Sequence, residues 1–570
     1  MSIKITAIHE RVDDIPTLIA HLKKMRVAEF LDKHFPTNGN WQGVSLGWTT
    51  VVWLAFILSE GDHRFARAEP WVTAHRRTLS RCIGRKVKPL DLTDDRLATV
   101  LDYLCIAACC VAFERELNQS VLRVYDLQER AVRVDTTTAA AYVTPDGMCQ
   151  LGYSKDHRPD LPQVKIAMSV LDPLGLPLTT TVVAGHTADD PLYLPEIAKV
   201  RQIARITGLT YVGDCKMAAL GTRAEIVAHQ DYSLCPLSAK QMPNAELDRL
   251  LDPVVSGARE ASAIRLPHAD GTLDETADPV AIGFAYTVEL SALDQAGQTR
   301  TWQERRLVVR SLAFATSQEK SLRQRVARAV TEINALDERK QGKQPVPDEA
   351  AVHQAATALI AKHRVDGLVH VTVTTEVHEH VKRRYGTRPA TTVRSERVRV
   401  SGASDEATLA QAVRRLGWRV YATNHTAEAL SLTQGVAAYR SEYLIEHGFG
   451  RLKGRSLSLT PLFLRYEHRV VGLIGLLSIA LRVLVLMQFV VRRTLQNAGA
   501  TLKGIYPGQP GRQTAKPTTE MMLQAFRGVT LSRITIDGKP HDHLTPLNDV
   551  QKRILALMEV PLESYYGLIT

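Results

Sequence analysis

The sequence predicts a multidomain protein of the α+β class, and three observations support this prediction. A chain of 570 residues is too long for one compact core. Its first quarter carries apolar residues at helical spacing, whereas strand-like and helical runs alternate from about residue 131. The composition, 45% apolar and 23% charged, is that of a folded protein. We therefore expect separate helical and mixed domains.

Residues 1–128 predict a helical N-terminal domain. Apolar-striped runs cover residues 17–35 and 44–61, and a third run begins after Thr93, a residue type that caps helices. The basic segment AHRRTLSRCIGRKVKP lies between the second and third runs. The N-terminal sequence MSIKITAIHERVDD has no apolar core or cleavage site, so we do not expect a signal peptide there.

Residues 129–237 predict the first part of a mixed core. Three strands come first, in VRVDTTTAAAYV, VKIAMSVLD and LPLTTTVVAG, and two helix–strand pairs follow with short connections. This order is that of an RNase H-like sheet, although the spacing also permits other mixed α/β folds.

The remaining chain predicts three further segments. Residues 238–415 interrupt the alternation of strands and helices. They predict a β-rich insertion with a helical arm around the polar linker DERKQGKQPVPDE. Residues 416–496 contain the strand WRVYATN and the helix ALSLTQGVAAYRSEYLIEHGFGRLKG, which we assign to the second part of the core. A Pro- and Gly-rich linker then begins a small C-terminal domain, residues 497–570, where HDH at 541–543 is expected in a loop.

The charge of the chain favours a polyanionic partner. The formal net charge is +11 at pH 7, and residues 451–512 hold ten Lys and Arg against one acid. Nucleic acid is the first candidate and an anionic membrane surface the second. For any single cation in this segment, a solvated surface position remains the simpler interpretation.

One apolar stretch is long enough to span a bilayer. It covers residues 470–491, but Arg482 at its centre would cost about 2.5 to 3.5 kcal/mol on insertion. We therefore predict a buried helix. The seven cysteines form no CxxC pair, which favours reduced, mostly buried thiols.

Two acids lie in or at the end of strands of the predicted core. Asp135 lies within VRVDTTTAAAYV, and Asp214 ends LTYVGD. If both strands belong to one sheet, the two carboxylates converge, and a hard divalent cation such as Mg²⁺ would stabilise them. The alternatives are an Asp135 satisfied by neighbouring threonines and an Asp214 that caps the following helix.

A third carboxylate is available in YRSEYLIEHGFGRLKG. Glu446 lies seven residues after Tyr439 and seven before Lys453, so one helix would carry all three on the same face. Glu442, four residues earlier, is an alternative to Glu446 as the third carboxylate. Glu446 by itself would be a typical surface acid of a helix.

The segment GYSKDHRPDLP predicts a charged turn beside this site. Lys155 and Arg158 are candidates for contacts with DNA phosphates, and the alternative is an exposed hairpin held by local ion pairs. Trp302 in the insertion could stack on an extruded base, although core packing is the simpler role.

Together these motifs resemble the DDE transposases of bacterial insertion sequences. The match is closest to the insertion sequence 4 superfamily in its insertion-sequence-1634-like branch and covers about residues 90–530. The motifs that carry it are Asp135 in VRVDTTT, GYSKDHRPDLPQ, VVAGHTADDP, Asp214 in YVGD, YATN, and YRSEYLIEHGFGRLKGRSLSLTPLFL.

The resemblance implies a set of site residues. It places Asp135, Asp214 and Glu446 at three catalytic, metal-binding carboxylate positions in an RNase H-like core that a β-rich insertion interrupts. Tyr439 and Lys453 match the signature of the last catalytic helix, with contacts to DNA.

Position 442 departs from the family pattern. An arginine is expected there, and this chain has Glu442. Arg440 is nearby but lies on another side of a helix, so the phosphate contact of the family arginine has no clear counterpart.

The resemblance also implies cofactors, partners and a location. We expect two Mg²⁺ ions, which Mn²⁺ can replace, and double-stranded DNA as terminal inverted repeats and target. Arg451 and Arg455 join the expected DNA contacts, with residues 1–128 as the reader of the element end. A homodimer on DNA, no membrane partner, and a bacterial cytoplasmic, nucleoid-associated location complete the expectation.

Three functions are compatible with these residues. The first is cut-and-paste transposition, in which hydrolysis frees a 3′-OH that then attacks DNA. The second is an RNase H-like nuclease that cuts without joining. The third is a catalytically dead DNA-binding repressor, which Glu442 in place of arginine slightly favours.

Overall fold

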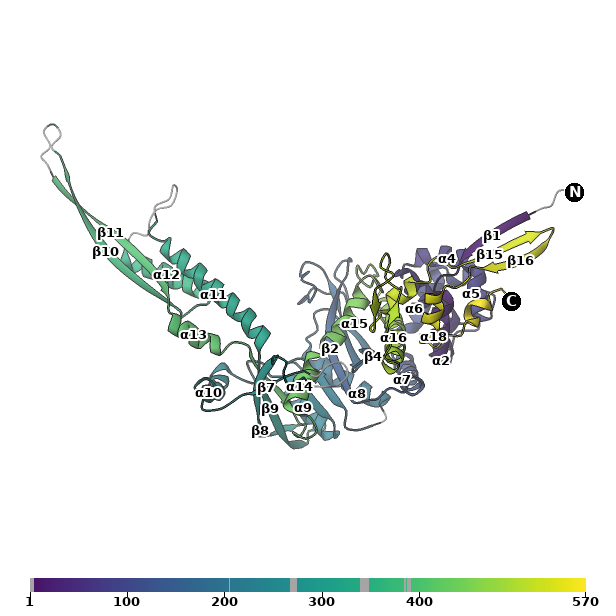
Figure 1. Cartoon of the computed structure of the whole chain (residues 1–570), viewed down its shortest axis with the longest axis horizontal. Helices are drawn as coiled ribbons and strands as arrows, with labels where there is room; N and C mark the ends of the chain where they lie inside the picture. The colour runs from purple at the N-terminus through teal and green to yellow at the C-terminus, as the bar shows by residue number, and fades with distance from the viewer. Residues whose placement is uncertain are drawn as a thin grey trace. The chain divides into compact units, whose positions relative to one another are not determined.

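The computed structural model describes residues 5–204, 206–266, 274–338, 348–383, 386 and 391–569. It divides into two compact units (Figure 1). Unit 1 comprises Met1–Cys235, Leu290–Trp302 and Ala438–Thr570, and unit 2 comprises Pro236–Glu289 and Gln303–Ala437. Both units combine helices and strands, which confirms the predicted multidomain α+β class.

The N-terminal part of unit 1 is helical, as predicted. Its helices are α1 (Ile15–Lys24), α2 (Val27–His34), α3 (Leu46–Glu60), α4 (Phe65–Ala74), α5 (Arg76–Ile83), α6 (Asp94–Leu104) and α7 (Ala107–Val124), with the short helix η1 (Pro89–Leu92) before α6. Thr93 is the N-terminal flanking residue of α6. The predicted run 17–35 is two helices, because Arg26 between them has φ +58°.

A strand at the start of the chain was not predicted. β1 (Ile5–Arg11) pairs antiparallel with β15 (Thr530–Ile536), which pairs antiparallel with β16 (Lys539–Leu544). The prediction that residues 541–543 form a loop is therefore wrong: they lie in β16, where Asp542 pairs with Arg533 and Arg81. The other C-terminal elements are β13 (Leu502–Lys503), β14 (Gln513–Thr514), α17 (Thr519–Gln524), α18 (Asp549–Leu557) and α19 (Glu563–Tyr566).

The sheet of unit 1 has the predicted RNase H-like order. Along the sheet the strands run β4 (Leu176–Ala184), β3 (Gln163–Leu171), β2 (Ala131–Ala140), β5 (Thr210–Gly213), β6 (Tyr232–Pro236). β2, β3 and β4 are antiparallel neighbours, whereas β5 is parallel to β2 and β6 to β5. Helices α8 (Tyr193–Ile203), which follows the short helix η2 (Asp190–Leu192), and α9 (Leu220–Ala228) supply the connections. The first strand of the core, β2, is thus central.

The apolar stretch 470–491 lies in a buried helix, as predicted. It belongs to α16 (Glu467–Asn497), which packs against α6 and β4. Within the described chain, α16 is the one unbroken helix long and apolar enough to cross a membrane, and 89% of its most apolar window is buried. Arg482 is fully buried, and it pairs with Glu114 at 2.8 Å. A paired, buried guanidinium is the arrangement a protein interior tolerates.

Unit 2 contains the elements expected of the insertion. Its strands β7 (Ser262–Ile264), β8 (Ala281–Leu293), β9 (Thr299–Ser311) and β12 (Trp418–Thr423) lie side by side in the order β12-β9-β8-β7. A two-stranded ribbon, β10 (Val369–Lys382) and β11 (Thr391–Ser404), packs on α11 (Leu312–Asn334) and α12 (Glu349–His363). The other helices of this unit are α10 (Asn244–Val255), α13 (Glu406–Arg414) and α14 (Leu432–Arg440), the last residues of which belong to unit 1.

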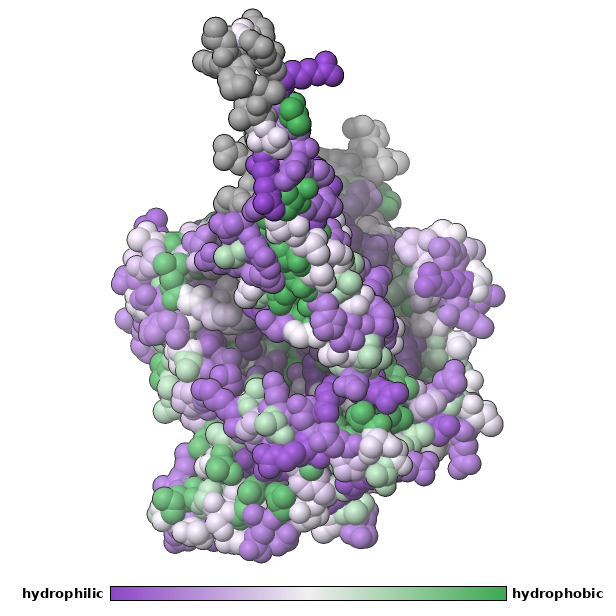
Figure 2. All heavy atoms as spheres, turned by 90° about the vertical axis from the view of Figure 1, so that its left-hand side faces the viewer, coloured by the Kyte–Doolittle hydropathy of each residue, from purple (hydrophilic) through white to green (hydrophobic). Residues whose placement is uncertain are grey.

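The helical arm has its own core, which includes Val326, Ile333 and Val365. Figure 2, in which the ribbon is turned toward the viewer, shows hydrophilic side chains interspersed with smaller apolar patches. Residues 339–347 of the predicted linker DERKQGKQPVPDE lie outside the described residues. Trp302, at the end of the hairpin segment that belongs to unit 1, is 7% exposed, which fits packing rather than base stacking.

Candidate active site

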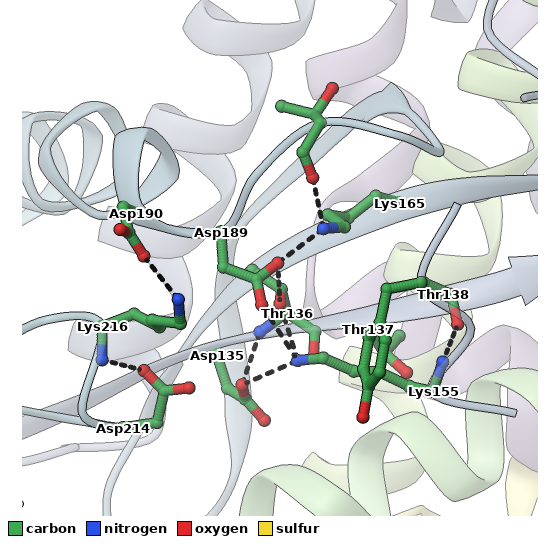
Figure 3. A network of polar contacts seen from close by, with 12 residues as sticks. Asp135, Thr136, Thr137, Thr138, Lys155, Lys165, Asp189, Asp190, Asp214 and Lys216 are labelled. Carbon is green, nitrogen blue, oxygen red and sulfur yellow. Dashed lines mark hydrogen bonds and ion pairs between the residues drawn. The ribbon is translucent and has the colours of Figure 1, made fainter. Parts of the chain in front are cut away.

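The sheet of unit 1 brings two predicted acids together. β2 and β5 are parallel, with Val134 opposite Gly213, so Asp135 within β2 and Asp214 directly after β5 lie at the same level of the sheet. Both line one cleft, and Figure 3 shows the two carboxylates beside each other. The cleft is lined by Arg133, Val134, Asp135, Val212, Gly213, Asp214, Tyr439, Glu442 and Ile445.

Asp135 is an acid in an unfavourable place for negative charge. Its burial raises the pKa to about 6, and the charges of Asp214 and Glu442 act in the same direction. Two groups oppose this effect: the Lys155 ammonium lies 3.6 Å from Asp135 Oδ1, and the Thr136 N–H donates to Oδ1 at 2.7 Å. A further cation at this site would stabilise the ionised form of Asp135.

Asp214 is held by two donors. The Tyr193 hydroxyl of α8 donates to Oδ1 at 2.6 Å, and the Lys216 N–H donates to the same atom at 2.8 Å. Burial, with the negative charge of Asp214, keeps the pKa of Tyr193 well above its ordinary value, so the hydroxyl stays a donor. A Cβ at Gly213 would lie 2.8 Å from Met217 Sδ and 3.1 Å from the Tyr193 ring, so a larger residue there would require these side chains to shift.

Thr136 and Asp189 link Asp135 to two lysines (Figure 3). The Thr136 hydroxyl donates to Asp189 Oδ1 at 3.0 Å and accepts from Lys155 Nζ at 2.8 Å. Lys165 Nζ lies 2.7 Å from Asp189, and although burial raises the pKa of that acid, the lysines and Thr136 bring it below its ordinary value. Asp189 is therefore an ionised anchor for both lysines.

The sequence reasoning missed Tyr193, Asp189 and Lys165. The motif VVAGHTADDP contains Asp189 and Asp190, but nothing in its spacing indicates which of these two acids faces the site. Tyr193 gave no signal, because a tyrosine at the start of a helix has no spacing that predicts a contact with a strand end. Only the sheet order brings these residues to Asp135 and Asp214.

The predicted helix over residues 429–454 is wrong in one respect: it is broken. α14 ends at Arg440, and α15 runs over Tyr443–Lys453. In a continuous helix the Glu442 N–H would donate to the Ala438 carbonyl. Instead the buried Arg133 guanidinium donates to that carbonyl, and the Glu442 N–H donates to Tyr439 O at 3.1 Å. Tyr439 and Glu446 therefore stand on different helices.

This break decides which glutamate faces the aspartates. Glu442 is half-buried and lines the cleft, whereas Glu446, one turn further along, is exposed and does not line it. Burial raises the pKa of Glu442, and the charges of Glu446 and Asp214 add to this. Of the three predicted carboxylates, the structure thus brings Asp135 and Asp214 together and leaves Glu446 outside their cleft.

Lys453 and Lys155 approach the threonines of β2 from two directions. Lys453 Nζ lies 2.5 Å from Asp156 and 3.0 Å from the Thr137 hydroxyl. Lys155 Nζ donates to Thr136 O at 2.6 Å, so it points inward, toward the site.

The predicted DNA-contacting arginines are in different states. Arg158 pairs with Asp160 at 2.7 Å on the surface, and Arg451 pairs with Glu520 at 2.9 Å. Arg455 is exposed. Of these three, Arg455 is the one whose side chain lies open to solvent without a neighbouring acid in the described contacts.

The donor set fits a hard divalent cation. Asp135, Asp214 and Glu442 present carboxylate oxygens, the ligands Mg²⁺ prefers, around a cleft whose buried acid favours added positive charge. In the part of the chain described, no three Asp, Glu, His or Cys side chains lie close enough to hold one ion together. Binding therefore requires a glutamate side chain to turn toward the aspartates.

Three comparisons relate the chain to known proteins. No protein-family model matches it. No curated protein matches it. Among solved structures it is similar to a piggyBac transposase in a synaptic complex with hairpin DNA, with 9% sequence identity and a TM-score of 0.34 over 98% of this chain and 88% of that chain.

Proposed function

We propose that the protein is a DDE transposase of the insertion sequence 4 superfamily, in its insertion-sequence-1634-like branch, that cuts and joins DNA at the terminal inverted repeats of its own element. The observation that carries the proposal is the placement of Asp135 on β2 and of Asp214 directly after β5, the neighbouring parallel strand of an RNase H-like sheet, in one cleft. Two neighbouring carboxylates in one cleft can hold the metal ions that phosphoryl transfer requires.

The residues of the site divide the work. Asp135, Asp214 and a glutamate from the start of α15 would hold Mg²⁺, which when bound neutralises charge on the phosphate and activates water. The donors on Asp214 and the Thr136 N–H on Asp135 fix the two carboxylates before the metal binds. A preset geometry of this kind favours in-line attack.

Two lysines beside the threonines that follow Asp135 suit a phosphodiester backbone. Lys155 and Lys453 come from different segments, and each is already held by a threonine of β2. The excess of positive charge, +11 for the chain, supports salt-sensitive DNA binding by residues 1–128 and by exposed cations such as Arg455. A homodimer on DNA would bring two element ends together for joining.

The test uses labelled duplexes taken from both flanks of the gene, incubated with the full chain and Mg²⁺. Joining of the labelled end to a second duplex supports transposition. Cleavage without joining would replace the proposal with a nuclease, and a shifted but uncut duplex would replace it with a repressor. Asp135→Asn is the control, and it should retain DNA binding while losing both reactions.

A further inference from the structure

Position 442 is where this chain departs from the family pattern and where the helix breaks. A guanidinium there would neutralise one of the nearby aspartates, whereas Glu442 adds a third carboxylate to a cleft that already holds Asp135 and Asp214. The one arginine that lines the cleft, Arg133, is engaged by Asp172 at 2.7 Å and by the Ala438 carbonyl. The acids of the cleft therefore exceed its cations.

We infer that Glu442, rather than Glu446, supplies the third carboxylate of the metal site in this chain. The inference rests on the proposed function and names the ligand set of the same site. Its basis is position: Glu442 lines the cleft with both aspartates, and Glu446 is exposed one turn away.

A helix-capping role does not account for Glu442. It is the residue that precedes α15, yet its side chain makes no capping hydrogen bond with the backbone of that helix. A carboxylate in this position usually stabilises a helix by accepting from the first free N–H groups. Here the side chain is half-buried toward the cleft instead, beside Tyr439.

The backbone explains why Glu442 and not Glu446 faces the aspartates. The Ala438 carbonyl accepts from Arg133 and from the Ser441 N–H, and the Glu442 N–H donates to Tyr439 O, so the chain tightens before α15 begins. Arg133 lies two residues before Asp135 on β2, so one strand fixes both the first aspartate and the turn that carries Glu442. A glutamate has the reach and rotational freedom to close the remaining distance to a shared ion.

The test is calorimetric titration of the full chain with Mn²⁺ in the absence of DNA. We compare the wild type with Glu442→Gln, Glu446→Gln and Asp135→Asn; the two glutamine variants remove the same charge one helical turn apart. Glu442→Gln should weaken Mn²⁺ binding by about tenfold or more, as Asp135→Asn should, whereas Glu446→Gln should change it by less than about threefold. Circular dichroism verifies that each variant is folded.

The other outcomes separate the two proposals. If Asp135→Asn weakens Mn²⁺ binding and Glu446→Gln does so as much as or more than Glu442→Gln, the inference is overturned and the proposed metal site stands. The same holds if Glu442→Gln binds like the wild type. If Asp135→Asn leaves Mn²⁺ binding unchanged, the metal site of the proposed function fails, and the inference fails with it.

Discussion

Asp135 and Asp214 reach the cleft from strands, whereas Glu442 reaches it from a break between two helices. The strand side is set by the pairing of β2 with β5 and by donors to each carboxylate. The helix side depends on one guanidinium, that of Arg133, and one tightened turn. More contacts therefore hold the aspartates on the strand side than hold Glu442 on the helix side.

The cleft therefore has a rigid wall, the strand side with Asp135 and Asp214, and an adjustable wall, the helix side with Glu442. A metal site assembled from both would take its geometry from the strands and adapt through the glutamate. Arg133 lies on β2 and contacts the Ala438 carbonyl, so it belongs to both walls, and its substitution is the first test.

Arg133→Met should have the largest effect on stability. The Arg133 side chain is 3% exposed and pairs with Asp172 at 2.7 Å. Removing one partner of a buried pair leaves the other charge uncompensated, so we expect a loss of about 3 to 5 kcal/mol in the free energy of unfolding. Urea denaturation measures this loss. Because the Ala438 carbonyl also loses the Arg133 donor, the turn that carries Glu442 should loosen, and Mn²⁺ binding should weaken as well.

Arg158→Met is the matched control for that variant. It removes the same group from the exposed pair with Asp160, in which Arg158 is 44% exposed. Surface pairs contribute about 0 to 1 kcal/mol, so this variant should unfold close to the wild type. Equal losses for both variants would contradict the assignment of Arg133 as the residue that holds the adjustable wall.

The rigid wall carries a charge that destabilises it at neutral pH. Burial raises the pKa of Asp135 from 3.8 to about 6, so the folded protein binds this proton more tightly than the unfolded chain does. Stability from this group is present below pH 3.8 and is lost as the pH rises to about 6. Asp135→Asn should therefore be more stable than the wild type by up to about 3 kcal/mol near pH 7.5 without metal.

The pH dependence distinguishes charge from packing. The advantage of Asp135→Asn should shrink near pH 4, where the wild-type carboxyl is largely protonated in the folded state, and it should also shrink when Mg²⁺ is added at neutral pH. Thermal unfolding at both pH values, with and without Mg²⁺, measures it. An advantage that does not change with pH would show that the effect is not electrostatic.

Gly213→Ala should strain the rigid wall to a smaller extent. Its Cβ would fall 2.8 Å from Met217 Sδ and 3.1 Å from the ring of Tyr193, the donor to Asp214. Overpacking of this kind costs about 1 to 3 kcal/mol. Urea denaturation tests this value. Gly450→Ala in α15 is the control, because its Cβ would meet nothing within 4 Å, and it should be neutral or stabilising.

The sequence predicted the rigid wall better than the adjustable one, for a physical reason. Asp135 and Asp214 stand in local apolar runs that predict strands, and the order of strands and helices is that of an RNase H-like sheet, in which the two acids can lie side by side. The break before Glu442 has no local signal, since neither proline nor glycine stands there. One contact at the break comes from Arg133, which precedes Ala438 by 305 residues and donates to its carbonyl. Spacing along a helix could not reveal a contact of that range.

The smallest predicted effect concerns the threonines of β2, which could be bonded partners of the lysines or only good strand formers. The Thr137 hydroxyl accepts from Lys453 Nζ at 3.0 Å. If this bond matters, Thr137→Val should lose about 0.5 to 1.5 kcal/mol in the free energy of unfolding, even though valine favours strands. Thr374→Val, at an exposed strand position of β10, should be neutral or slightly stabilising. If urea denaturation shows the same small gain for both variants, β-propensity alone explains Thr137, and Asp156 and the Thr138 carbonyl are enough to hold Lys453 in place.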